Sequence, residues 1–154
     1  MNVVLVEPEI PPNTGNVARL CAATRTRLHL IEPLGFRLAD RDLQRAGMDY
    51  WQHVEWRRWP DWTAFLAGQP AGARWWFIES GGPRRYTEAE FGPDDYLVFG
   101  RETAGLPRAW LEAAPERWLR LPMCHREARS LNLANCVAVV LFEALRQQGF
   151  PGEV

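Results

Sequence analysis

Lysine is absent from this chain of 154 residues: all 18 of its basic residues are arginine, and the formal net charge is −1. A balanced charge argues against a protein coated with basic patches. Genomic base composition is the main explanation for the arginines. A local nucleic-acid surface is the other, because the planar guanidinium suits phosphate.

Long apolar runs are also missing, and none approaches the roughly 18 residues that a membrane span needs. No basic stretch followed by an apolar one opens the chain, so we expect a cytoplasmic protein without membrane segments. The three cysteines are odd in number and lack metal-ligand spacing, which favours reduced, small hydrophobic side chains over a disulfide or a zinc site.

The common catalytic and nucleotide-binding signatures are missing as well. The dinucleotide motif G-x-G-x-x-G does not occur, and the glycines Gly100 and Gly105 are not followed by the lysine of a phosphate loop. The histidines are scattered, and no Ser-His-Asp, Cys-His or paired-carboxylate arrangement is apparent. A nicotinamide-dependent oxidoreductase is therefore disfavoured.

Short buried strands alternate with helical patterns along the chain. We expect strands at 2–6, 28–31, 54–56, 75–78, 96–99 and 118–121, and helices ending near 25 and spanning 40–46, 61–67, 107–113 and 131–147. This alternation predicts an α/β fold, with a mostly parallel sheet flanked by helices, in a single domain over 1–154.

Three loops stand out because small or polar residues follow an apolar run and precede a helix. They are EPEIPPNTGNVARL (7–20), LVFGRETAGLP (97–107) and RLPMCHREARSLNLAN (120–135). The carboxyl ends of parallel strands meet at one edge of the sheet, where ligands bind. We expect the three loops to form one pocket.

In the first loop, Asn13 or Thr14 is expected to cap the next helix, and Gly15 permits close backbone approach. Arg19 follows Gly15 and Asn16 by one helical turn and can point at the same spot. A helix N-terminus with an arginine suits a phosphate. The alternative is a capped turn with a surface arginine.

In the second loop, Glu102 lies between Gly100 and Gly105, which let the backbone approach a ligand. Glu102 either meets a positive charge on that ligand or favours the dipole of the helix that begins at Pro107.

In the third loop, Ser130 is expected to cap the last helix, and Asn132 and Asn135 share one face of it. Amides in a mostly apolar helix are costly to bury without partners. They hydrogen-bond either a ligand or a neighbouring loop.

The last helix is apolar around much of its circumference, which is typical of a helix buried on two sides. A homodimer follows, unless the helix is sandwiched inside the monomer. The residues concerned are Leu133, Cys136, Val137, Val139, Val140, Leu141, Phe142 and Ala144.

At these loops the sequence resembles the SPOUT superfamily of S-adenosylmethionine-dependent RNA methyltransferases. It is most similar to the small, single-domain branch that 2′-O-methylates the wobble nucleotide of tRNA. The stretches IEPLGF and RAGMDYW extend the resemblance over nearly the whole chain. It implies a C-terminal trefoil knot, a homodimer, S-adenosylmethionine bound in the knotted loops without a metal, and the tRNA anticodon loop as substrate.

The resemblance also implies roles for individual residues. It assigns catalysis at the ribose hydroxyl to Arg19 and Asn132, and RNA contacts to Asn13 and Asn16. The basic Arg126 and Arg129 are phosphate contacts or solvated loop charges. The residues implied to bind the cofactor are Ile78, Gly100, Glu102, Leu121 and Ser130.

The sequence departs from the pattern of this branch at three places. Phe142 stands where relatives often carry tyrosine, Glu79 and Ser80 stand where relatives often show small hydroxyl residues, and the loop at 124–128 is more basic. Two alternatives therefore remain open: a 2′-O-methyltransferase acting at another tRNA or rRNA site, and an inactive RNA-binding protein with this fold.

Overall fold

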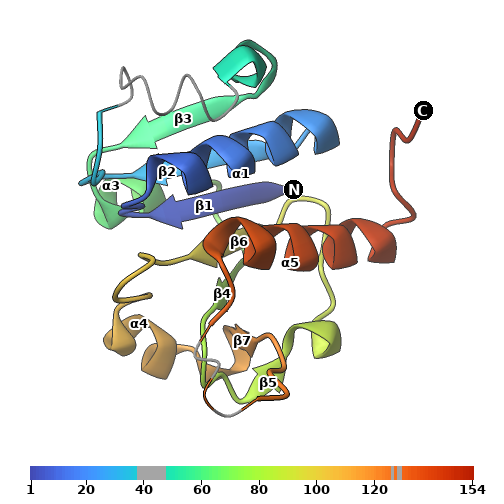
Figure 1. Ribbon diagram of the computed structural model, residues 1–154. Helices are drawn as coiled ribbons and strands as arrows, with labels where there is room; N and C mark the ends of the chain where they lie inside the picture. The colour runs from blue at the N-terminus through green and yellow to red at the C-terminus, as the bar shows by residue number, and fades with distance from the viewer. Residues whose placement is uncertain (38–47, 126, 128–129) are drawn as a thin grey trace.

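Seven parallel strands form one sheet in the computed structural model, which describes residues 1–37, 48–125, 127 and 130–154 (Figure 1). The strands are β1 (Asn2–Val6), β2 (Arg27–Ile31), β3 (Trp56–Trp59), β4 (Trp75–Ile78), β5 (Arg84–Arg85), β6 (Tyr96–Phe99) and β7 (Trp118–Arg120). The helices are α1 (Pro11–Thr24), α3 (Trp62–Ala67), α4 (Arg108–Ala113) and α5 (Leu133–Gln147), with short 3-10 helices η1 (Met48–His53), η2 (Tyr86–Glu88) and η3 (Pro115–Arg117). The expected α/β architecture is confirmed.

The strand order β3-β2-β1-β6-β4-β7-β5 positions the ligand site. Because every pairing is parallel, all strands end at one edge, to which the arrowheads of β1 and β3 point at the left of Figure 1. From β1 the sheet grows through β2 in one direction and through β6 in the other. Open α/β sheets bind ligands beyond the carboxyl ends of the strands at such a switch point.

The strands are buried on both faces, which explains continuous apolar runs such as NVVLV. Val3 and Leu5 belong to the core beneath α1 and α5, whereas Val4 packs with Phe65 of α3 and Leu111 of α4. In Figure 1, α1 and α5 lie side by side in front of the sheet. Their outer faces therefore point the same way.

Most element predictions are confirmed. The strands expected at 2–6, 75–78 and 96–99 have the predicted ends, and the second and last strands differ by one residue. The helix expected at 61–67 begins one residue later, with Asp61 as its N-cap accepting a hydrogen bond from Ala64 N at 2.7 Å.

The sequence pattern does not give the bounds of two strands, β3 and β5, which form the edges of the sheet. The strand predicted at 54–56 is wrong, because β3 begins only at Trp56 and follows η1. Its first three residues are exposed, as befits an edge strand, so the apolar signal is weak. β5 has two residues, too few to show alternation. The helix predicted at 40–46 lies outside the described residues.

The three cysteines are free thiols, and burial raises the pKa of Cys21 to about 12, so this side chain packs as a small hydrophobe. Among the helices of the described residues, none is long and apolar enough to cross a membrane.

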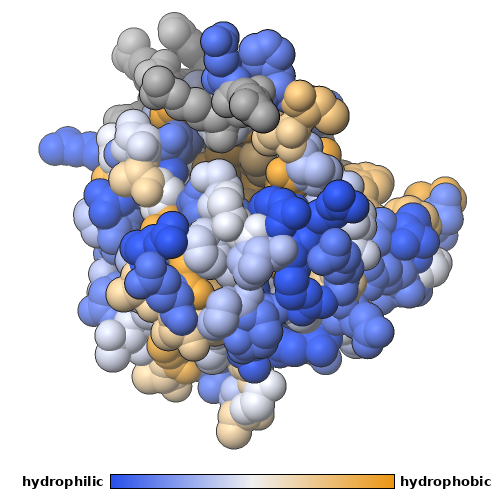
Figure 2. All heavy atoms as spheres, turned by 90° about the horizontal axis from the view of Figure 1, so that it is seen from below, coloured by the Kyte–Doolittle hydropathy of each residue, from blue (hydrophilic) through white to orange (hydrophobic). Residues whose placement is uncertain are grey.

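The lower edge of the sheet in Figure 1 ends with β5, and Figure 2 shows this side of the molecule from below. Hydrophilic residues cover most of it, and hydrophobic residues appear only in small patches. Arg84 donates to the carbonyl of Glu116 at 2.7 Å, and Arg120 donates to the carbonyls of Gly82 and Pro83. Charged side chains on an edge strand discourage pairing with another copy.

His29 of β2 is buried within a polar network inside the sheet. Trp59 Nε1 donates to His29 Nδ1 at 3.1 Å, and His29 Nε2 lies 3.3 Å from Asn2 Oδ1. Because Nδ1 accepts, the proton of the neutral ring belongs on Nε2, where it is donated to Asn2. Burial lowers the pKa of His29 to about 4, and the nearby Arg27 and Arg57 add to the effect.

Stability is expected to fall in mild acid because of His29. Below its ordinary pKa of 6.5, the unfolded chain takes up a proton that the folded chain refuses until about pH 4. This residue then lowers the free energy of unfolding by about 2 kcal/mol between pH 7.5 and pH 5. Urea unfolding of the wild type and His29→Gln at both pH values measures the difference. An equal loss in the variant contradicts the prediction.

Candidate active site at the carboxyl edge of the sheet

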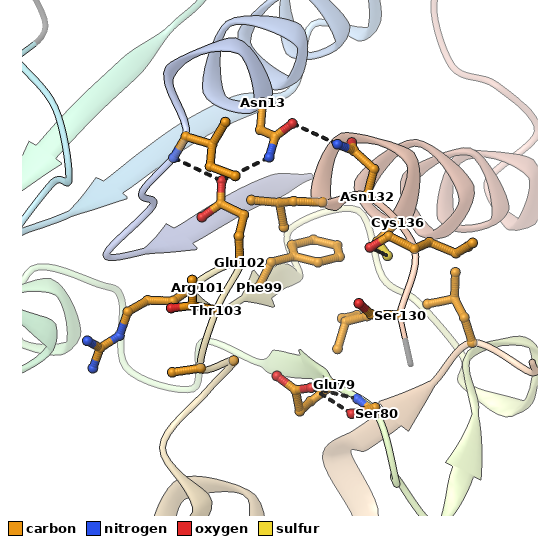
Figure 3. Close-up of a pocket in the computed structure, with 18 of the residues that line it drawn as sticks. Asn13, Glu79, Ser80, Phe99, Arg101, Glu102, Thr103, Ser130, Asn132 and Cys136 are labelled. Atoms are coloured by element: carbon orange, nitrogen blue, oxygen red, sulfur yellow. Dashed lines mark hydrogen bonds between the residues drawn. The ribbon is translucent and has the colours of Figure 1, made fainter. Parts of the chain in front are cut away.

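A cavity of about 490 Å³ lies beyond the carboxyl ends of β6, β4 and β7 (Figure 3). All three loops singled out in the sequence reach it, so the structure brings them together at the predicted edge. Its lining comprises Ile10, Asn13, Ile78, Glu79, Ser80, Phe99, Gly100, Arg101, Glu102, Thr103, Ala104, Gly105, Leu121, Met123, Ser130, Leu131, Asn132, Leu133 and Cys136.

The loop after β6 turns back tightly on itself. Arg101 and Gly105 exchange backbone hydrogen bonds of 3.3 and 2.9 Å. A Cβ at Gly100 would lie 2.2 Å from the carbonyl carbon of Gly105. Gly105 has a φ of +65°, and its Cβ would lie 2.1 Å from a Glu79 oxygen. Neither position has room for a side chain, because the loop packs against itself and against Glu79. Both glycines also border the cavity, which they can reach only with main-chain atoms.

Glu79 fastens this loop to the end of β4. One carboxylate oxygen accepts from Leu106 N at 3.0 Å, and the other accepts from the backbone and hydroxyl of Ser80 at 2.8 and 3.0 Å. The sequence marked Glu79 only as a departure from relatives. Its place directly after the buried strand β4, at the edge where ligands bind, is the feature of the sequence that could have marked Glu79 as a site residue.

The first and second loops hold each other through two carboxylates. Glu102 accepts from Glu9 N at 2.8 Å, from Ile10 N at 3.2 Å and from Asn13 Nδ2 at 3.0 Å. Glu9 in turn accepts from the hydroxyl and the backbone of Thr103, hydrogen bonds that lower the pKa of Glu9. The alternative that Glu102 favours the dipole of the helix after Pro107 does not match these contacts. Its carboxylate is held by the backbone just before α1 and by the side chain of Asn13.

A third contact joins the last loop to the other two. Asn132 Nδ2 donates to Asn13 Oδ1 at 2.8 Å, and Asn132 Oδ1 accepts from Ala134 N at 2.9 Å. Figure 3 shows Asn13 between Glu102 and Asn132, hydrogen-bonded to both. Of the two alternatives for Asn132, the structure shows the contact with a neighbouring loop.

Both long helices, α1 and α5, have other N-cap residues than the sequence predicts. α1 begins at Pro11, so Asn13 and Thr14 lie inside it and the prediction that one of them caps it is wrong. The two prolines at its start lack an N–H, which leaves fewer amides to satisfy. The N-cap residue, Ile10, has no accepting side chain, and its own backbone N–H donates to Glu102 of the second loop at 3.2 Å.

Similarly, the prediction that Ser130 caps the last helix is wrong. α5 begins at Leu133, and its N-cap is Asn132, which Asn13 holds in place. Asn135 is exposed in the single chain, so the burial argument does not apply to it.

The residues implied to bind the cofactor share one location. Each of them borders the cavity: Ile78, Gly100, Glu102, Leu121 and Ser130. Asn13 and Asn132 border it as well. The sequence did not single out Cys136 as a site residue, although it also lines the cavity. Burial raises the pKa of its thiol, so Cys136 offers no thiolate nucleophile at neutral pH.

Other candidate residues lie elsewhere. Asn16 and Arg19 are exposed on the outer face of α1 and do not line the cavity. Arg126 and Arg129 fall outside the described residues. Within the part of the chain that the structure describes, no group of three or more His, Cys, Asp or Glu residues is arranged to hold a metal ion.

Comparison with known proteins agrees with this geometry. The sequence matches the SpoU rRNA Methylase family over residues 1–142. The tRNA (cytidine(34)-2'-O)-methyltransferase of Burkholderia pseudomallei (strain 1106a) is 56% identical over 153 residues, which cover 98% of this chain and 97% of the relative.

Solved structures match as well. One described as "Structural insights into the 2-OH methylation of C/U34 on tRNA" has a TM-score of 0.88 at 47% identity and covers 96% of this chain and 95% of its own. The SpoU methyltransferase AviRb from Streptomyces viridochromogenes, in complex with the cofactor AdoMet, has a TM-score of 0.82 at 25% identity. That match covers 96% of this chain and 60% of AviRb. The chain belongs to the SpoU rRNA Methylase family.

Proposed function

We propose that this protein transfers a methyl group from S-adenosylmethionine to the ribose 2′-hydroxyl of the wobble nucleotide, position 34, in the anticodon loop of tRNA. The observation that carries the proposal is the 56% identity over 98% of the chain to a relative with that named activity. The structure concerned with C/U34 methylation also covers nearly the whole chain. These matches favour tRNA over the ribosomal RNA in the family's name. The cytoplasm, where tRNA is modified, is the expected location.

The cavity suits S-adenosylmethionine in size and in chemistry. Its volume of about 490 Å³ lies within the range of roughly 300–1,000 Å³ that is typical of small-molecule sites. Gly100 borders the cavity with main-chain atoms, Ile78 and Leu121 offer apolar surface to a planar ring, and Ser130 adds a hydroxyl. We assign these four residues to cofactor binding. Glu102 supports the same site by holding the first loop in place.

When bound, S-adenosylmethionine supplies a methyl group on a positively charged sulfur, which an oxygen nucleophile accepts by in-line displacement. The protein must orient the hydroxyl and provide for loss of its proton. Arg19 cannot take that proton, because a guanidinium stays protonated in proteins. We assign Arg19 to orienting the ribose hydroxyl beside a phosphate, and a phosphate oxygen or water accepts the proton.

Other residues act around this step. Asn132 has both polar side-chain atoms engaged and acts by positioning the third loop. Asn16 is exposed on α1 near Arg19 and is assigned to RNA contact. Arg126 and Arg129 are proposed as phosphate contacts on the ground of sequence alone. Single-stranded loops are the usual targets of specific RNA recognition, which suits an anticodon loop.

The proposed fold includes a trefoil knot near the C-terminus. The chain leaves β7 near one edge of the sheet and returns to α5, which packs beside α1 and against β6. On the way, the connection and the loop after β6 line the same cavity. This course supports a knot in which the two loops cross at the cofactor site.

A homodimer is proposed through the outer face of α5. Val139 and Phe142 of this face are 40% and 48% exposed, unusual values for apolar residues of a helix that packs on a sheet. Arg19 is exposed on the outer face of α1, which lies beside α5. A second copy docked on α5 therefore covers the side of the molecule that carries Arg19.

The variant Phe142→Glu is expected to be monomeric and to lose most methylation activity, because the charge resists burial in the apolar contact. Light scattering during size-exclusion chromatography gives the mass, and a tRNA assay gives the activity. Thr63→Glu on α3, on the opposite face of the sheet, adds the same charge and serves as the control. A wild type that is monomeric at assay concentration contradicts the dimer.

The function is tested with purified protein, labelled S-adenosylmethionine and tRNA transcripts. We expect one 2′-O-methyl group at nucleotide 34, located by mass spectrometry of nuclease fragments. A tRNA with a 2′-deoxyribose at position 34 should accept no methyl group. Methylation elsewhere supports another site in tRNA or rRNA. Calorimetry showing no binding of S-adenosylmethionine points instead to an inactive RNA-binding protein.

A further inference from the structure

A second hollow, of about 690 Å³, opens beyond the carboxyl ends of β2 and β3. The proposed function makes no use of it. Its lining consists of Glu32, Pro33, Leu34, Phe36, Arg37, Arg58 and Pro60. Because all strands of the sheet are parallel, this hollow, here called the β2–β3 hollow, lies at the same edge as the cofactor cavity.

The side chains of the β2–β3 hollow combine an aromatic ring with positive charge. Phe36 is half-buried and lines the hollow. Arg58 lies 3.5 Å from Glu32, and both side chains are exposed, 54% and 37%, so they stay accessible to a ligand. With Arg37, the lining carries two guanidinium groups and one carboxylate. Aromatic rings that stack bases and arginines that bind phosphates are the usual parts of a single-strand site.

The β2–β3 hollow is connected to the cofactor cavity through the backbone. Gly35 N donates to the carbonyl of Pro8 at 2.9 Å. A Cβ at Gly35 would lie 2.7 Å from Glu9 Cα, so the two loops touch directly. Glu9 in turn holds Thr103 beside the cofactor cavity. The wall of the hollow and the rim of the cavity are therefore fixed relative to each other.

The spacing of the two sites suits a single-stranded RNA. The strands β2 and β3 at the hollow are separated from β6 and β4 at the cavity by β1 alone. The middle of the cavity lies at β4, three and a half strand spacings from the middle of the hollow. At about 4.8 Å per strand, the centres lie roughly 17 Å apart along the edge. An extended loop of a few nucleotides covers this distance.

We propose that the β2–β3 hollow binds a nucleotide of the anticodon loop other than the one that is methylated. This inference rests on the proposed function and adds a substrate subsite to it. The base stacks on Phe36, Arg58 contacts the adjoining phosphate, and Glu32 accepts a hydrogen bond from a base amino group. The subsite recognises the neighbourhood of position 34 and sets which tRNAs are substrates.

Two conservative variants test the subsite by RNA binding. Phe36→Leu keeps an apolar side chain but removes the stacking surface, and we expect affinity for an anticodon stem-loop to fall about tenfold or more. Arg58→Gln should weaken binding and reduce the slope of log affinity against log salt by about one. Arg57→Gln is the matched control, because Arg57 precedes Arg58 on β3 and its guanidinium lies over the Trp59 ring at 4.0 Å. Its salt slope should stay nearer that of the wild type.

A set of stem-loops, each with one abasic loop position, locates the nucleotide. At one position other than 34, removal of the base should weaken binding to the wild type about tenfold but add little to the loss in Phe36→Leu. A merely structural role for Phe36 predicts equal losses at every position in both proteins. Calorimetry with S-adenosylmethionine should give unchanged affinity in both variants, which confirms that the cofactor cavity is intact.

Methylation of nucleotide 34 is measured with the same RNAs, which separates the two proposals. If the wild type methylates nucleotide 34 normally, and Phe36→Leu and Arg58→Gln bind RNA with wild-type affinity and salt dependence, the subsite is overturned but the proposed reaction is not. Additive losses at every abasic position overturn it as well. If the loss of one base and the change Phe36→Leu have non-additive effects on binding, but the protein does not methylate position 34, the subsite is upheld and the proposed reaction is overturned.

Discussion

Replacing Arg19 by alanine is expected to lower the rate of tRNA methylation by about 10²-fold, the usual size of the loss when a reacting group is no longer held in position. Arg19 is exposed on α1 and does not line the cofactor cavity, so S-adenosylmethionine should bind the variant with unchanged affinity. Arg19→Lys should recover only part of the rate. A lysine keeps the charge but loses the planar fork that contacts a hydroxyl and a phosphate together.

Single-turnover methylation with saturating tRNA, together with cofactor calorimetry, separates the role of Arg19 in the reaction from a role in binding. Arg27→Ala is the control, since Arg27 is an exposed arginine at the start of β2, paired with Glu55 at 2.8 Å, and should be replaceable without loss of activity. Near-normal methylation by Arg19→Ala with intact cofactor binding removes Arg19 from the mechanism.

The sheet could be predicted because its central strands are buried on both faces. NVVLV, WWFI and YLVF are continuous apolar runs, and each becomes a strand with the predicted ends. The edge strands β3 and β5 have exposed arginines and little apolar signal. Their place depends on pairing with β2 and β7, contacts that no local pattern encodes.

The loops of the site could be located, but not the way in which they are joined. Glu102 lies 92 residues from Ile10 in sequence, yet its carboxylate accepts from the backbone N–H of this residue at the start of α1. Ser130 and Asn132 are both good N-caps by residue type, and Asn132, which caps α5, is also bonded to Asn13, 119 residues away in sequence. Such choices are made by tertiary contacts, so residue type and spacing gave the wrong cap for both helices.

The substitution Asn13→Asp probes these contacts without changing the shape of the side chain. Asn13 is 6% exposed, and its amide nitrogen donates to Glu102 at 3.0 Å. Aspartate would place an oxygen there, which removes a hydrogen bond to a charged group and sets two carboxylates against each other. The dipole of α1 favours the new charge by at most about 1 kcal/mol. The loss dominates, and we expect the variant to be less stable by about 3 kcal/mol at pH 8.

The pH dependence of Asn13→Asp distinguishes this repulsion from a simple loss of packing. Two adjacent carboxylates raise the pKa of one of them in the folded state, so the folded chain binds a proton more readily than the unfolded chain. The destabilisation relative to wild type should therefore shrink from pH 8 to pH 5, as the shared proton restores the bridge to Glu102. Urea unfolding at both pH values measures it, with Asn16→Asp, exposed on the same helix, as the control. A deficit that is the same at both pH values means that Asn13 only fills space. A shrinking deficit, together with methylation that recovers in the same direction, means that the bond from Asn13 to Glu102 holds the first two loops in their active arrangement.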